Sequence, residues 1–248
     1  MRKLYYIFYN ILINPLLTYM WLRKKKFNFK GNNLKIHSFK NKYQGKTCLI
    51  VGSASSLDLE EFTDFIKKNE VIVFSFNSVT LNFKRINFSP DYYSIIDPKI
   101  FNDLMSHAVS NFDQKTTFLL SNSMKFINDR SILFKISYFN HFIEFMGIIL
   151  LRKHLFSQKI EKVIFDGYSV LYFTLQIVLF MGFSKIHLMG IDLNYQQNGK
   201  YAIDYKGSPT PDQNAVMNMR IYFELFLKRA KKIGINVINS SSKSPLKL

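Results

Sequence analysis

The sequence predicts an α/β protein in which one mostly parallel sheet carries helices on both faces, with an N-terminal membrane-associating helix in front of it. Three observations lead to this prediction. Short apolar runs alternate with amphipathic runs after residue 46, polar residues follow the apolar runs, and an uncharged apolar stretch opens the chain. Parallel strands need long crossover connections, usually helices, so this alternation favours a parallel sheet.

The alternation assigns the elements in turn. Apolar strands are predicted at 47–51, 71–76, 92–96, 116–120, 185–189 and 236–238. Helices are predicted at 59–68, from Pro98 onward, at 170–181 and at 213–233. Proline suits the first turn of a helix, because the N–H that it lacks would have no helical partner there. The series is typical of a single Rossmann-like domain over residues 47–248, a length that can bury one substantial core.

The first 26 residues are predicted to associate with a membrane. Residues 4–22 carry no charge, and a bilayer-spanning helix needs ~20 such residues. Asn10, Asn14 and Thr18 recur every four residues and Pro15 interrupts the run, so a helix lying in the interface is favoured over a spanning one. The alternatives are a cleaved signal peptide, for which the sequence has no small-residue cleavage site, and a helix packed on the protein or on a second subunit. The last of these leaves a homo-oligomer open.

Positive charge is concentrated at the front of the chain. The net charge is +17, and residues 1–57 hold 11 Lys or Arg and no acid. A basic segment beside an apolar one predicts that residues 2–46 contact an anionic membrane surface, and it argues against nucleic acid as a partner. Residues 27–46, Lys-rich with Gly31, Asn32 and Asn33, are predicted to be a solvated basic linker. The single cysteine, Cys48, excludes an intramolecular disulfide and fits a reducing compartment.

A candidate site is predicted from the residues that follow the strands. Ser53, Asn77, Asp97, Asn122 and Asp192 each come just after an apolar strand. The carboxyl ends of parallel strands share one edge, which is where open α/β sheets bind ligands. Asn and Asp also serve as turn formers and helix caps, and that alternative stays open for each residue taken alone.

The loop after the first strand, Gly52-Ser53-Ala54-Ser55-Ser56-Leu57, is predicted to approach a ligand. Small residues let the backbone come close, and free N–H groups at the start of the next helix would attract a phosphate. The loop has no Lys after a second Gly, as a P-loop requires, and it lacks the three glycines of a dinucleotide fingerprint. The loop alone therefore predicts a nucleotide-phosphate site of no particular class.

This loop and four later segments resemble, in the same order, family 42 bacterial sialyltransferases and the related Maf-type flagellin glycosyltransferases. The later segments are 73–77, 96–101, 120–122 and 169–204. In the loop, Ser53 replaces Asn and Ala54-Ser55 replace Gly-Pro. The segment 169–204 is the most specific, because it combines the spacing of both families around Gly190 with a later pattern in which two tyrosines bind the donor phosphate.

The resemblance implies an inverting, metal-independent glycosyltransferase with no cofactor besides its CMP-sugar donor. Such an enzyme passes a nonulosonic acid, sialic-acid-like, to a lipid-linked glycan acceptor such as lipopolysaccharide, lipooligosaccharide or capsule. It would act at the cytoplasmic face of the bacterial inner membrane, held peripherally or by a single N-terminal anchor. Tyr195 and Tyr201 would donate hydrogen bonds to the departing phosphate. The residues assigned to the donor are Gly52, Ser53, Ser55, Ser56, Asn77, Asp97, Ser121, Asn122, Ser169 and Gly190.

The base for the acceptor hydroxyl is where the chain departs from the sialyltransferase pattern. Those enzymes carry a His in a Gly-His-Ser segment, and residues 205–209 here hold none. His187 lies inside a predicted strand and is expected to be a core or sheet-face residue. Asp192, Asp204 and Asp212 remain as candidate bases, and Asp204 is preferred because it flanks the tyrosines. The missing His leaves open another acceptor, another sugar or a catalyst that has lost activity.

Two other functions fit part of the sequence. A pterin pyrophosphokinase-like enzyme, from a branch related to the Maf proteins, would share the small-residue loop and could hold magnesium with Asp97 and Asp192. A non-enzymatic peripheral membrane scaffold would explain residues 1–46, but it would leave the polar strand ends unexplained.

Overall fold

The computed structural model describes residues 29–124, 129–145, 147, 149–157, 159–193 and 213–248. The chain divides into two units, residues 1–34 and 35–248. Helix α3 (Phe29–His37) begins in the first unit and ends in the second. The predicted N-terminal membrane helix lies outside the described residues. The second unit holds the sheet and its crossover helices.

Seven parallel strands form the main sheet, in the order β5-β4-β3-β2-β1-β8-β9. The order runs outward from β1 to β5 on one side and from β8 to β9 on the other, so it reverses between β1 and β8. Such a reversal opens a crevice at the carboxyl ends of the strands, and ligands bind there in open α/β sheets. The predicted α/β class and mostly parallel sheet are confirmed. The strands are β1 (Thr47–Val51), β2 (Ile72–Phe76), β3 (Tyr92–Ile95), β4 (Thr117–Ser121), β5 (Ser131–Phe134), β8 (Lys185–Met189) and β9 (Asn236–Asn239).

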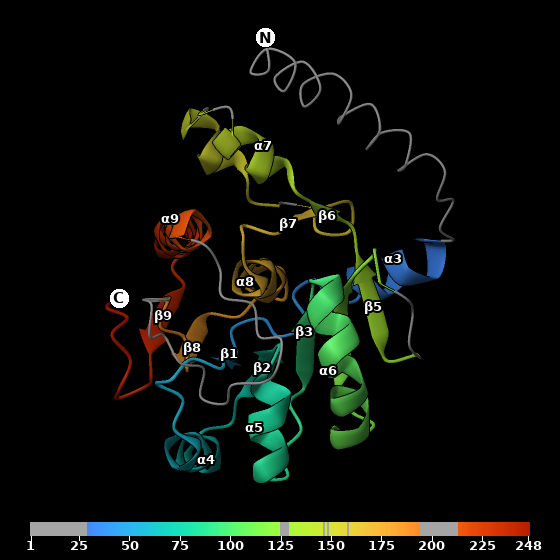
Figure 1. Ribbon diagram of the computed structural model, residues 1–248, viewed down its shortest axis with the longest axis vertical. Helices are drawn as coiled ribbons and strands as arrows, with labels where there is room; N and C mark the ends of the chain where they lie inside the picture. The colour runs from blue at the N-terminus through green and yellow to red at the C-terminus, as the bar shows by residue number, and fades with distance from the viewer. Residues whose placement is uncertain (1–28, 125–128, 146, 148, 158, 194–212) are drawn as a thin grey trace. The chain divides into compact units, whose positions relative to one another are not determined.

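Helices cover both faces of this sheet (Figure 1). One face carries α4, α5 and α6, and the other carries α8 and α9. Successive side chains of a strand point to opposite faces, so Cys48 and Ile50 pack toward α8 whereas Leu49 and Val51 pack toward α4. The helices are α4 (Leu59–Lys68), α5 (Val79–Arg85), α6 (Pro98–Asn111), α8 (Val170–Phe180) and α9 (Gln213–Lys232).

The two layers use helices of different character. Helix α4 buries Phe62 and has acids in its first turn and lysines in its last, an arrangement that complements the helix dipole on a surface helix. Helix α8 is apolar all round, and its side chains from Val170 to Val178 are buried, because it lies between the sheet and α9.

A small second sheet stands on the α8 side. It pairs β6 (Ile136–Ser137) with β7 (Ile164–Phe165) in parallel. The connection between these two strands contains α7 (Phe139–Phe145) and the 3-10 helix η2 (Ile149–His154). Figure 1 shows α7 drawn beyond β6 and β7. This excursion places the residues after β6 and those after β7 next to each other.

Residues 35–46 pack on the domain, where a solvated linker was expected. Ile36 and Phe39 are buried. The N–H of Tyr43 donates to the carbonyl of Met181 at 2.9 Å, and its ring stacks on Phe183 with centroids 5.0 Å apart. The lysines of the segment suggested solvent exposure, but its apolar side chains determine the packing, since burying them is favourable while Lys heads stay in water.

Candidate functional site

The crevice between β1 and β8 begins where two glycines meet. A Cβ on Gly52 would lie 2.5 Å from the carbonyl oxygen of Gly190. Gly190 itself has φ +62°, a conformation that glycine adopts without steric cost. The N–H of Gly52 donates to the carbonyl of Met189 at 2.8 Å, and that of Ala54 donates to the carbonyl of Gly190 at 2.9 Å. Both glycines assigned to the site therefore lie at one point and hold the β1 and β8 loops in backbone contact.

Asp192 clamps the loop that follows β1. Its Oδ2 accepts hydrogen bonds from the N–H of Ser56 at 3.3 Å and from the hydroxyl of Ser55 at 3.5 Å. Its Oδ1 accepts a short hydrogen bond from the hydroxyl of Ser56. The structure thus brings these three predicted site residues together, and the Asp192 carboxylate holds the loop in place.

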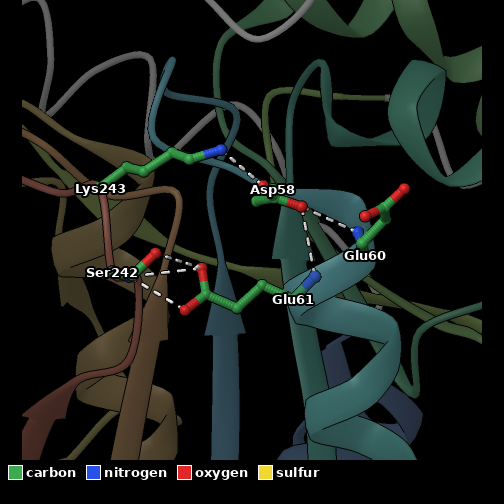
Figure 2. Close-up of polar contacts among 5 residues, drawn as sticks. All are labelled: Asp58, Glu60, Glu61, Ser242 and Lys243. Carbon is green, nitrogen blue, oxygen red and sulfur yellow. Dashed lines mark hydrogen bonds and ion pairs between the residues drawn. The ribbon is translucent and has the colours of Figure 1, made fainter.

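The helix that follows the loop does not offer free N–H groups to a phosphate, contrary to expectation. Figure 2 shows Asp58 at the start of α4, where Oδ1 accepts hydrogen bonds from the N–H groups of Glu60 at 3.0 Å and Glu61 at 3.2 Å. Oδ2 pairs with Lys243 at 2.7 Å, and this bond is the largest cause of the lowered pKa of Asp58. Ser242 donates its N–H to Glu61 at 3.0 Å. The carboxylates of Asp58, Glu60 and Glu61 at this turn do not favour a phosphate there.

Ser53 and Asn77 follow the neighbouring strands β1 and β2. Ser53 is buried, and its hydroxyl accepts a hydrogen bond from Ser78 at 2.7 Å. Asn77 has φ +50°, and its carbonyl accepts a hydrogen bond from the hydroxyl of Tyr93. Its side-chain Oδ1 is buried and accepts no hydrogen bond from the part of the chain that the structure describes. A buried acceptor without a donor is costly, and a ligand that supplied one would remove that cost.

Two residues assigned to the donor are helix caps. Asp97 begins α6, where Oδ1 accepts hydrogen bonds from the N–H groups of Lys99 at 2.7 Å and Ile100 at 3.4 Å. Ser169 begins α8, where its hydroxyl oxygen accepts from the N–H of Tyr172 at 3.1 Å. Such caps stabilise helices without any ligand. Asp97 is nevertheless exposed, just after the end of β3.

Ser121 and Asn122 lie at the end of β4. Ser121 is buried, and its hydroxyl shares a hydrogen bond with Ser123 at 2.8 Å. Tyr138, which follows β6, lies near this strand end, since burial raises the pKa of its phenol and Asp97 and Ser121 both affect that pKa as well. The N–H of Asn122 donates to the carbonyl of Phe134 at 2.8 Å, so this residue's backbone completes the β4–β5 pairing.

The remaining predicted residues fall in a segment outside the described residues. They are Tyr195, Tyr201, Asp204 and Asp212, and their assigned roles stay predictions. The chain enters this segment from Leu193, whose carbonyl accepts a hydrogen bond from Nε of Arg220 at 2.7 Å.

A second polar group of residues, which sequence reasoning missed, lies around α7. We name it the α7 cluster, and its members are His141, Glu144, Arg152, Asp166, Tyr168 and Tyr222. Nε2 of His141 lies 2.9 Å from Oδ2 of Asp166, and the two side chains are 44% and 7% exposed. The imidazole stacks on the ring of Tyr168 with centroids 3.9 Å apart. Asp166 directly follows β7. That strand is two residues long, which is too short for the sequence to predict it.

An ion pair between Glu144 and Arg152 stabilises the α7 cluster. Nε of Arg152 donates to Oε1 of Glu144 at 2.6 Å, and a second, shorter bond joins the guanidinium to Oε2. The hydroxyl of Tyr222 also donates to Oε1, at 3.0 Å. Burial alone would raise the pKa of Glu144, but the bonds from Arg152 and Tyr222 outweigh it, so the pKa is lowered. Glu144 is therefore held as a carboxylate beside the His141 imidazole.

His187, which the sequence placed inside a strand, lies in β8. Nδ1 of His187 shares a hydrogen bond with the hydroxyl of Ser240 at 2.7 Å, and burial followed by the charge of Lys185 lowers its pKa. It is a sheet-face residue, as predicted. Among the described residues, no three His, Cys, Asp or Glu side chains gather in a way that suits a metal ion. No helix in the described ranges has the length and apolarity needed to cross a membrane.

Comparison with solved structures places this fold. The Maf glycosyltransferase from Magnetospirillum magneticum AMB-1 matches with a TM-score of 0.56 at 17% identity, over 89% of this chain and 38% of that one. This chain thus spans well under half of that protein, with which it shares the fold. The sialyltransferase CstII from Campylobacter jejuni in complex with cytidine-5'-monophosphate matches with a TM-score of 0.45 at 18% identity, over 82% of each chain. The same sialyltransferase with a trisaccharide acceptor and CMP gives 0.46 at 18% identity, over 81% of this chain and 83% of that one.

Sequence comparison identifies the family. No curated protein matches the chain. The family model described as 6-hydroxymethylpterin diphosphokinase MptE-like matches residues 22–198, which include β1 to β8 and both crevice glycines. Because that match covers well over half of the chain, the protein belongs to the MptE-like family.

Proposed function

We propose that the chain is a glycosyltransferase that passes a nonulosonic acid from a CMP-activated donor to a glycan of the cell surface, such as lipopolysaccharide, lipooligosaccharide or capsule. The observation that carries this proposal is the buried Oδ1 of Asn77, which lacks a donor among the described residues. Asn77 follows β2, one strand away from the β1–β8 reversal in the sheet order. Hydroxyl and amino groups of a nucleoside are donors of the kind that this oxygen needs. The Maf-like fold supports the proposal without assigning a substrate.

The crevice offers a row of polar groups to a long ligand. Its polar groups follow successive strands, from Ser53 after β1 to Asn77, Asp97 and Ser121 after β2, β3 and at the end of β4. Neighbouring strands lie ~4.8 Å apart, so these four positions span about 14 Å of the edge. A nucleotide-sugar laid along them would use neutral donors and acceptors at one end. Tyr195 and Tyr201 would donate hydrogen bonds to the departing phosphate, and the reaction would use no metal or cofactor.

A pterin diphosphokinase is the second candidate, favoured by the family match. Its triphosphate chemistry uses magnesium, whose ligands lie at about 2.1 Å and hence at most about 4 Å from one another. Asp97 and Asp192 follow β3 and β8, three strand spacings apart, or about 14 Å by ordinary strand geometry. Asp97 also caps α6, and Asp192 holds the β1 loop. These two acids therefore do not share one ion, which favours the glycosyltransferase.

The basic front of the chain fits a lipid-linked acceptor. Residues 2–46 carry no acid, so they would be attracted to an anionic membrane surface at the cytoplasmic face. Sedimentation of the full chain with vesicles of anionic lipid, but not with neutral vesicles, is the expected result. Equal binding to both kinds of vesicle would contradict this part of the proposal.

Ligand-induced stabilisation separates the candidate functions. At 100 times its Kd, CMP should stabilise the fold by about 2.7 kcal/mol, which raises Tm by about 5–11 °C for a domain of this size. ATP with magnesium should leave Tm unchanged. The reverse pattern would indicate the diphosphokinase, and no shift with either would indicate the scaffold. Release of CMP from CMP-sialic acid in the presence of mixed glycan acceptors then tests transfer directly.

A variant of Asn77 tests the residue that carries the proposal. Asn77→Gly removes the amide without straining the backbone, because glycine accepts φ +50°. Loss of one hydrogen bond, about 1–1.5 kcal/mol, should weaken CMP binding about tenfold. Asn87→Gly is the matched control, since Asn87 has φ +49° and is exposed at the end of α5. Equal CMP affinity in both variants would exclude Asn77 from the donor site.

A further inference from the structure

We infer that His141, oriented by Asp166, is the base that takes the proton from the acceptor hydroxyl, an inference that rests on the proposed transferase function. No sequence motif marks this pair, whose members are 25 positions apart. The structure joins them because the parallel strands β6 and β7 end side by side, with α7 starting after one and Asp166 following the other.

The pair leaves one imidazole nitrogen available for proton transfer. Beside a carboxylate, neutral His141 keeps its proton on Nε2 and donates it to Oδ2 of Asp166 at 2.9 Å. Nδ1 is then the acceptor, and it has no hydrogen bond to any residue within the described ranges. The imidazole is 44% exposed, whereas the carboxylate is 7% exposed. A buried carboxylate that orients a solvent-accessible imidazole is an arrangement that supports general-base catalysis, as in the Ser-His-Asp triad.

Asp166 is more than a surface ion-pair partner. Its Oδ1 is buried and has no hydrogen-bond partner among the described residues, so half of the carboxylate is held away from water. A structural carboxylate in such a place would be expected to satisfy both oxygens. Among the described residues, the hydrogen bond to His141 is therefore the one bond that the Asp166 carboxylate makes.

The backbone beneath the imidazole is strained in a way that fixes its aromatic neighbour. Gly167 and Tyr168 have φ +53° and +61°, and a tyrosine in this region is uncommon. A Cβ on Gly167 would collide with the ring of Tyr172. The turn presents the Tyr168 ring to His141, and burial followed by the charges of Glu144 and Asp166 raises the pKa of Tyr168 to about 12. This phenol therefore stays protonated.

Tyr138 connects the pair to the crevice. Its ring lies 5.8 Å from that of His141, and Ser121, at the end of β4, affects the pKa of its phenol. Burial, followed by the charges of Asp166 and Asp97, raises the pKa of Tyr138, so both carboxylates lie near this one phenol. Asp97 and Ser121 belong to the row of strand ends. The imidazole thus lies toward the β3–β4 end of the row of strand ends, and His141 can act as the base only if the donor sugar lies at this end.

The reaction at this point is a displacement. The acceptor oxygen forms a bond to the anomeric carbon of the donor sugar while the bond from that carbon to the phosphate oxygen breaks. The electron pair of the broken bond leaves with CMP. The hydroxyl proton passes to Nδ1 of His141, the imidazolium is stabilised by Asp166, and the proton returns to water after the product departs.

Variants of the full chain test the assignment. In His141→Gln, kcat for sugar transfer should fall by about 100-fold or more, while the donor KM and the CMP-induced rise in Tm stay unchanged. Added imidazole should restore part of the rate of His141→Gly. Asp166→Asn should lower kcat without rescue by imidazole. His107→Gln, on the exposed side of α6, is the matched control and should keep the wild-type rate.

Several outcomes decide the matter. A His141→Gln enzyme within about twofold of the wild-type rate would overturn the inference alone, since proton transfer by this group is worth far more. A wild-type chain that neither binds CMP nor releases it would overturn the proposed function, and the inference with it. If the variants fail to fold, diethyl pyrocarbonate on the wild type replaces them. Loss of transfer should then follow modification of His141, not of His107, and a glycan acceptor should protect; no correlation with His141 would overturn the assignment.

Discussion

The close approach of Gly52 and Gly190 predicts how strongly the crevice resists a single added methyl group. In Gly190→Ala, the new Cβ would collide with the carbonyl oxygen of Gly52 and lie 2.8 Å from Cβ of Leu57. The residue would also sit at φ +62°. The left-handed conformation costs about 1–2 kcal/mol for alanine, and overpacking adds about 1–3 kcal/mol. The expected loss in the free energy of unfolding is therefore about 3.5 kcal/mol, the sum of the mid-range backbone and packing costs.

Gly234→Ala separates the two contributions. Gly234 has φ +77° after the end of α9, and a Cβ there meets no atom within 4 Å. This variant should lose about 1.5 kcal/mol, from the backbone alone. Thermal denaturation followed by circular dichroism should then show Tm falling by about 3–6 °C for Gly234→Ala and by about 7–14 °C for Gly190→Ala. Equal losses in the two variants would refute the claim that the β1 and β8 loops touch through their backbones.

Three further predictions concern the ion pair and the loop clamp. Arg152→Met should cost about 3 kcal/mol in urea denaturation, because it leaves Glu144 buried without its partner; the double variant with Glu144→Gln should recover part of that loss, and a double variant as unstable as the single one would contradict this account. Because the pKa of Glu144 is lowered, its contribution to the free energy of unfolding is complete above the ordinary pKa of 4.5 and is lost as pH falls through the folded pKa. Glu144→Gln should therefore flatten the decline in unfolding free energy below pH 4.5. Parallel plots of unfolding free energy against pH for the variant and the wild type would contradict this. Asp192→Ala frees the hydroxyls of Ser55 and Ser56, which should cost about 1–3 kcal/mol and speed proteolytic cleavage between residues 52 and 57, measured by mass spectrometry; an unchanged cleavage rate would show that the clamp is dispensable.

Most of the main sheet was predictable because its strands carry strong local signals, but β5 (Ser131–Phe134) was not predicted. The runs at β1 and β8 are five apolar-rich residues followed by glycine, and α8 is apolar except for Thr174 and Gln176. The elements that the sequence did not reveal are short or lie in polar surroundings. β6 and β7 have two residues each, and α3 occupies a Lys- and Asn-rich stretch. Such elements form because tertiary contacts hold them, which no local pattern expresses.

The positions of the candidate site followed from topology, but the roles of its residues did not. Parallel strands place Ser53, Asn77 and Asp97 on one edge whatever their side chains do. Whether a side-chain oxygen bonds a ligand or a backbone N–H of its own chain depends on the side-chain rotamer. In Asp97, Oδ1 bonds the first turn of α6. The contact of His141 with Asp166 depends on how an irregular connection folds back. No spacing in the sequence encodes it.

The pairing of β1 with β8 also fixes when the crevice can form during synthesis. Thr47 pairs with Lys185, 138 positions later in the chain. At the usual rate of about 5–20 residues per second, the ribosome needs about 7–28 s to travel that distance. Throughout this interval the β1 edge has no neighbour on the β8 side, and its Cys48–Val51 backbone can pair with another nascent chain. The aggregation hazard of this protein is therefore set by the pace of translation and not by the stability of the finished sheet.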